Sequence, residues 1–185
     1  MQRRDLLKSF GAATALALLP HEAVAAWSRV ASGVRPANGL SAAHVDLVGA
    51  IADTILPRTT TPGATDVGVP AFVDVIVSEN YSDATRAAFV AGLDALEAQL
   101  LSTNGVMLQG SNRTAFAALP ASEREAAIGA VEQIADHRTP ATRAHWQLKG
   151  LIIHGYFTSE RVQKDLLGFE MMPGRFDGSA PMRAS

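Results

Sequence analysis

Five histidines are the residues of this chain best suited to binding a metal, and their spacing argues against a site built on one helix. His137 and His145 are eight positions apart, His145 and His154 are nine apart, and His21 and His44 are more distant still. Two ligands on one helix reach the same ion when they are three or four residues apart. A histidine metal site is therefore not predicted, and we expect His154 to be a hydrogen-bonded packing residue.

The remaining candidates for chemistry have simpler interpretations. Glu132 and Asp136 are four residues apart, a spacing typical of the solvated side of a helix. Trp146 and Tyr156 could form a cofactor platform, but aromatic residues at helical spacing more often belong to a core. The sequence contains no glycine-rich dinucleotide motif, P-loop or G-x-S-x-G nucleophile elbow.

The chain has no cysteine, which excludes several classes of site. A thiolate-bound iron–sulfur cluster, a C-x-x-C-H haem attachment, a cysteine nucleophile and a disulfide are all ruled out. The net charge is −2, with acidic and basic residues interspersed. Without a basic stripe or a polybasic segment, binding to nucleic acid or directly to anionic lipid is disfavoured.

The first 25 residues have the parts of an export signal. Arg3 and Arg4 precede an apolar run at residues 10–19, and Ala23 and Ala25 form an Ala-x-Ala cleavage site. The arginine pair indicates the twin-arginine (Tat) route, which carries folded proteins; an ordinary Sec signal is the alternative. The apolar run is too short to span a bilayer. We expect a Tat signal peptide at 1–25, a linker at 26–40 and a single domain at 41–185, located in the periplasm.

Helical spacing dominates the rest of the chain, so we expect an all-α fold: a small irregular bundle with long loops and an extended C-terminal tail. Ser41 is expected to cap a helix over residues 44–56, and Asp83 one over 83–101. A strand competes with a helix at 71–79. A capping box at Ser122 and Glu125 predicts another helix, and Thr139-Pro140 opens the last one at 140–158.

The helix at 140–158 is apolar around most of its circumference, which indicates burial on more than one side. It could be the central helix of the bundle, or it could pack on its own core with one side and on a second protein with the other. The tail at 170–185 is too apolar for a solvated segment, which favours the second interpretation. The expected partner interface comprises Trp146, Ile153, Tyr156, Phe157, Met171, Met172 and Phe176.

Two segments resemble a known family. Residues 55–64 read ILPRTTTPGA and are followed by VGVPAFVD at 67–74; residues 155–160 read GYFTSE and are followed by PGRFDG at 173–178. Together with the arginine pair, they resemble the gluconate 2-dehydrogenase subunit 3 family over residues 40–182. In one respect the chain departs from the family, because Ser179 stands where a cysteine is common. If that cysteine pairs with the large subunit, this chain must do without the bridge.

The resemblance implies a non-catalytic small subunit. The large subunit would be a flavoprotein of the glucose–methanol–choline (GMC) type that holds FAD and oxidises a sugar or polyol. In such complexes a multihaem cytochrome c often accepts the electrons and can hold the complex at the membrane. The small subunit stabilises the flavoprotein and carries it through the Tat translocase. The rival interpretation is a stand-alone periplasmic helical binding module or a small enzyme of unrecognised type.

Overall fold

The structure, a computed structural model, describes residues 20–33, 35–103 and 115–168, and all regular structure in these ranges is helical. This confirms the all-α prediction, and the segment that could have been a strand is helix α4. The extended tail expected at the C-terminus lies outside the described residues. The elements are α2 Pro20–Ser32, α3 Ala42–Ile55, the 3₁₀ turn η1 Thr65–Val67, α4 Val69–Asn80, α5 Asp83–Thr103, the 3₁₀ turn η2 Phe116–Ala118, α6 Ala121–Glu132, α7 Pro140–Thr158 and the π-helical turn η3 Val162–Leu166.

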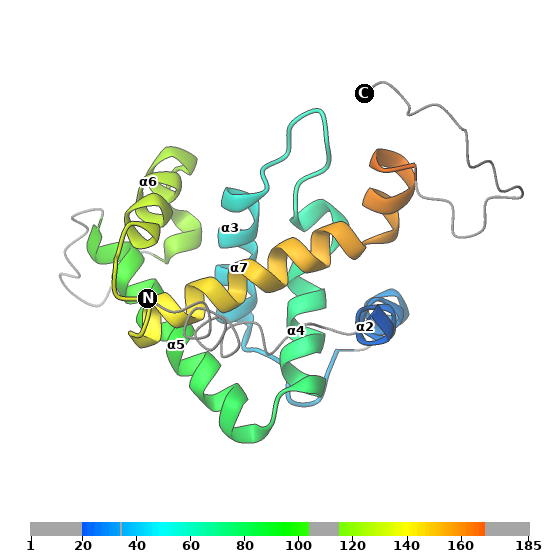
Figure 1. Cartoon of the computed structure of the whole chain (residues 1–185), viewed down its shortest axis with the longest axis horizontal. Helices are drawn as coiled ribbons and strands as arrows, with labels where there is room; N and C mark the ends of the chain where they lie inside the picture. The colour runs from blue at the N-terminus through cyan, green and yellow to red at the C-terminus, as the bar shows by residue number, and fades with distance from the viewer. Residues whose placement is uncertain (1–19, 34, 104–114, 169–185) are drawn as a thin grey trace, which may run out of the picture.

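Helix α7 is the element around which the others are arranged. It runs across α3 and α4 and packs most extensively on α5 (Figure 1). The helices approach closely at two glycines. A β-carbon on Gly92 of α5 would lie 2.8 Å from that of Ala144, and one on Gly155 would lie 2.7 Å from the ring of Phe72. The core therefore forms where α7 meets α4 and α5, with Phe72 fully buried at its centre.

Local capping explains two helix starts that the sequence predicted. The Ser41 hydroxyl accepts a hydrogen bond from the backbone N–H of His44, at 3.2 Å. The Thr139 hydroxyl accepts one from Thr142, also at 3.2 Å, and Pro140 follows at the first helical position. Both arrangements satisfy an N–H group that has no partner within the helix.

Two other caps differ from the prediction. Helix α5 is capped by Ser82, which accepts from the N–H of Thr85 at 3.2 Å, whereas Asp83 is already in the first turn. Helix α6 begins at Ala121 after Pro120, so Ser122 and Glu125 form no capping box. The carbonyl of Pro120 instead accepts from the N–H groups of residues 123 and 124. The helix thus starts two residues earlier than a cap at Ser122 would allow.

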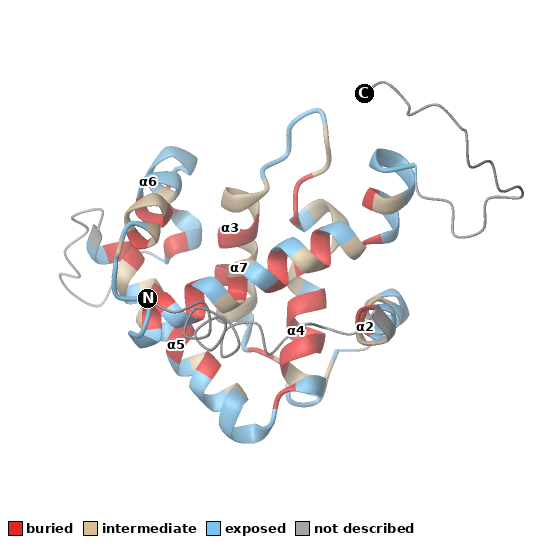
Figure 2. Cartoon of the chain, viewed as in Figure 1, coloured by how far each residue is buried: buried red, intermediate tan, exposed pale blue. Residues whose placement is uncertain are grey.

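The linker expected at 26–40 is corrected in its first part, because residues 26–32 belong to helix α2. This helix packs on α4 and α7, and its buried side faces them (Figure 2). The segment that follows is also attached to the domain. The buried carboxylate of Asp74 accepts from the N–H of Leu40 at 2.5 Å and lies 3.9 Å from Nε of Arg35. The composition of residues 26–40 gave no indication of these long-range contacts.

Candidate functional site

One side of helix α7 exposes large apolar side chains. Trp146, Ile153 and Phe157 are separated by seven and four residues, so they line up along the helix, and they are 37%, 38% and 45% exposed. Gly150 lies on the same side, and a β-carbon there would meet no atom within 4 Å. We call this side, defined by these four residues, the α7 face. Large apolar side chains exposed along one side of a helix are typical of a helix that packs against a partner.

The opposite side of α7 forms part of the chain's own core. Tyr156 was expected at the partner interface, and the structure corrects this, since its side chain is only 5% exposed. Its hydroxyl donates to the carbonyl of Pro62 at 2.8 Å and so attaches α7 to the loop at 57–64. The apolar circumference of this helix therefore divides into a core side and the α7 face.

Trp146 is held in place by neighbouring rings. Its indole N–H donates to Nδ1 of His137 at 3.0 Å, and the two rings meet edge to face with centroids 5.6 Å apart. The ring of His145 packs on it from another direction, with centroids 5.4 Å apart. The Nζ atom of Lys149 lies 5.3 Å from the ring centroid. A fixed aromatic side chain loses little entropy on binding, which suits it to anchor an interface.

A partly buried polar cluster supports this end of the α7 face. Glu132 accepts from Nε2 of His145 at 3.1 Å and from Nζ of Lys149 at 2.6 Å. His145 is fully buried, and its Nδ1 atom has no partner among the described residues. The carboxylate requires the proton on Nε2, so the neutral ring leaves Nδ1 as the free acceptor. The spacing of Glu132 predicted a solvated surface and did not reveal this cluster, because the three residues come from two helices.

Two groups of this cluster, His145 and Glu132, have pKa values below their ordinary ones. Burial lowers the pKa of His145 and outweighs the opposing effect of Glu132. Burial alone would raise the pKa of Glu132, but the hydrogen bonds and charges of Lys149 and His145 hold it below its ordinary value. Burial also lowers the pKa of His154, whose Nε2 has no partner among the described residues, so the hydrogen bond expected there is not found at that atom. The native state therefore favours neutral imidazoles.

We predict that the free energy of unfolding falls as the pH drops below about 6.5, the ordinary histidine pKa. Below that value the unfolded chain binds protons that the folded chain resists, so stability decreases by up to about 1.4 kcal/mol per pH unit for each such group. Urea unfolding between pH 7.5 and 5 measures this slope. In His145→Gln, whose amide can still donate to Glu132, the slope should be smaller, and His154 and Glu132 contribute to the remainder. Equal slopes in the two proteins would contradict the assignment.

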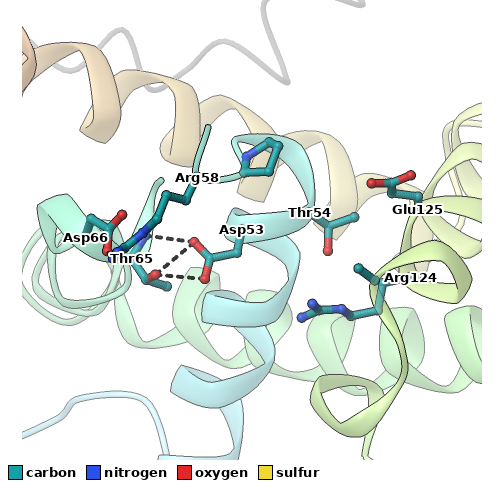
Figure 3. Close-up of a pocket in the computed structure, with 9 residues that line it drawn as sticks. Asp53, Thr54, Arg58, Thr65, Asp66, Arg124 and Glu125 are labelled. Atoms are coloured by element: carbon teal, nitrogen blue, oxygen red, sulfur yellow. Dashed lines mark hydrogen bonds and ion pairs between the residues drawn. The ribbon is translucent and has the colours of Figure 1, made fainter. Parts of the chain in front are cut away.

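A second site is a polar pocket of about 310 Å³ between α3, the loop after it and α6 (Figure 3). Most of its acids are already engaged. Asp53 accepts from the N–H and hydroxyl of Thr65, at 3.0 and 2.7 Å. Asp66 accepts from the N–H of Gly63 at 2.8 Å and pairs with Arg58. These contacts fold the loop at 57–66, so we assign the pocket a structural role.

Only some of the other predicted site residues lie within the described ranges. Arg3, Arg4, Met171, Met172 and Phe176 lie outside the described residues, as does Ser179, and their roles remain predictions. Ala23 and Ala25 lie within α2. Among the described residues, no group of three or more His, Asp or Glu side chains is placed to hold a metal ion. None of the helices described is long and apolar enough to cross a membrane.

Comparison with known proteins gives one match. The model of the family described as gluconate 2-dehydrogenase subunit 3 matches residues 42–174, well over half of the chain. The match includes the motifs at 55–64, 67–74 and 155–160 and the α7 face, and it ends at residue 174, within the motif at 173–178. No curated protein and no solved structure matches the chain.

Proposed function

This chain belongs to the gluconate 2-dehydrogenase subunit 3 family, and on that premise we propose that it is the non-catalytic small subunit of an exported, FAD-dependent sugar or polyol dehydrogenase. The family name implies a subunit of a larger dehydrogenase complex. In this proposal the FAD belongs to a GMC-type flavoprotein, and a multihaem cytochrome c is a further partner in electron transfer. The small subunit stabilises the flavoprotein and supplies the Tat signal for both.

The observation that carries the proposal is the family match over residues 42–174. The α7 face supports it, because Trp146, Ile153 and Phe157 form an apolar surface on a helix whose other side is already buried. Burying these side chains against a partner is favourable by a free energy of roughly 25 cal/mol per Å² of apolar area removed from water. We assign the α7 face to the flavoprotein.

A stabilising role follows from mass action. A partner that binds only the folded flavoprotein raises its free energy of unfolding by RT ln(1 + [L]/Kd), about 2.7 kcal/mol when the partner is present at 100 times Kd. The absence of cysteine means that this chain makes no disulfide to the flavoprotein. Its contribution therefore depends on concentration, and dilution should weaken it.

We expect the cognate flavoprotein to melt at a higher temperature, and to keep more of its FAD through gel filtration, when it is produced together with this chain. Thermal unfolding followed by flavin fluorescence measures the melting temperature, and the flavin absorbance of the eluted protein measures the FAD retained, with the flavoprotein alone as the control. Adding more of the small subunit should raise the melting temperature further. Identical melting temperature and flavin content with and without the chain would contradict the stabilising role.

A further inference from the structure

The predicted signal cleavage site lies inside a folded helix. Ala23 and Ala25, which define the Ala-x-Ala site, are in the first half of α2. Ala23 and Ala26 are each 3% exposed and face the rest of the domain, whereas Val24 and Ala25 face solvent. A protease reads its substrate as an extended strand, with side chains on alternating sides. The bond after Ala25 can enter such a site only when this part of α2 unwinds.

The contacts that hold α2 lie immediately after the bond to be cut. The ring of Trp27 stacks on that of Phe72 in α4, with centroids 5.0 Å apart, and its indole N–H donates to the hydroxyl of Thr158 in α7 at 3.0 Å. Arg29 pairs with Glu79 at 3.2 Å. Trp27 is the second residue beyond the predicted cut, so it falls within the stretch that a protease must extend. Cleavage therefore requires the Trp27 contacts to break.

We propose that helix α2 protects the predicted cleavage site, so that the folded chain is processed only when α2 leaves the surface formed by α4 and α7. The proposal rests on the export signal in the proposed function. When local opening is fast relative to cleavage, the rate of proteolysis follows the population of the open state. The rate of processing is then set by how tightly Trp27 holds α2. A chain exported in its folded state keeps its signal until α2 is released.

The test compares the folded full-length chain with a synthetic peptide of residues 1–35, which contains the whole predicted signal and has no domain to dock on. Bacterial signal peptidase is one probe. Elastase, which cuts after small residues, is a second probe that needs no signal recognition. With each, we expect the bonds around Ala25 to be cut at least about ten times more slowly in the folded chain than in the peptide, as for a site that must open first. Mass spectrometry identifies the bond cut.

Two variants identify the contact responsible. Trp27→Ala should remove most of the protection. Thr158→Val keeps the ring contact of Trp27 but loses its hydrogen bond, together with the one that the Thr158 hydroxyl donates to the His154 carbonyl, and should accelerate cleavage by a smaller factor. Val90→Ala, which shortens a partly buried side chain on α5, is the control and should behave as the wild type. Circular dichroism establishes that each variant is folded. Should Trp27→Ala prove unfolded, Thr158→Val decides the question.

The outcomes separate this proposal from the export signal itself. Equal rates in the folded chain and the peptide, or variants at Trp27 and Thr158 that are both cut at the wild-type rate, would overturn the protection by α2. A peptide that signal peptidase does not cut would refute the predicted signal, and the elastase rates would still decide whether α2 protects the site. The protection by α2 would be supported if the folded chain is cut slowly, Thr158→Val is cut faster, and Trp27→Ala is cut faster still.

Discussion

A carboxylate placed on the α7 face should abolish binding to the flavoprotein and leave this chain folded. Ile153→Asp and Phe157→Asp each put an ionised group where the proposed interface is apolar. Burying that group without a partner costs several kcal/mol, and each 1.4 kcal/mol weakens binding tenfold, so we expect the dissociation constant to rise at least about 100-fold. In the free chain both positions contact water, so the carboxylate stays hydrated. Titration of the flavoprotein by calorimetry measures the change.

The control variant carries the same added negative charge at a position away from the α7 face. Ala91 is an exposed apolar residue on α5, and Ala91→Asp introduces the same carboxylate on another helix. It should bind the flavoprotein as the wild type does. Surface substitutions of this kind usually change the free energy of unfolding by no more than about 0.5 kcal/mol. If all three variants bound equally well, the α7 face would not be the interface.

Replacing Arg3 and Arg4 with lysine should leave both this chain and the flavoprotein in the cytoplasm. The arginine pair is an address read by a receptor. A planar guanidinium makes paired hydrogen bonds that a lysine ammonium cannot reproduce, even though the charge is kept. Fractionation of cells followed by immunoblotting of both proteins measures their distribution. Lys8→Arg, which also exchanges one basic residue for another within the signal, is the control and should be exported normally.

In that experiment, the location of the flavoprotein shows whether the two proteins are exported together. If it reached the periplasm at the normal level while the small subunit remained in the cytoplasm, shared export would be refuted, although association could still hold. If both proteins were exported normally, the arginine pair would not be the signal. Retention of both is the result expected when the signal of one chain serves the folded pair.

The sequence predicted those features of the fold that depend on neighbouring residues. Ser41 and Thr139 were identified as caps because a hydroxyl reaches an N–H group only two or three residues away. At the start of α5 the prediction of Asp83 was wrong by one residue, because the Ser82 hydroxyl accepts from the helix instead. Pro120 was missed as the start of α6 because its carbonyl, not a side chain, satisfies the helix.

Features that depend on residues distant in the sequence could not be predicted. Trp27 packs on Phe72 and Thr158, so the helix that contains it looked like part of a linker. Glu132 meets His145 across two helices, which no spacing within one helix reveals. Tyr156 and Phe157 are adjacent and equally apolar in pattern, yet one is buried and the other exposed, because only the packing of α7 on its neighbours separates the two sides.

The most direct test of the proposed subunit role is a pull-down of the tagged chain from the periplasm, with the absorbance and mass spectra of the eluate recorded. We expect a yellow eluate that contains a large FAD protein in a fixed ratio to this chain. A colourless eluate with the chain folded and monomeric would contradict it, and would favour a stand-alone periplasmic protein.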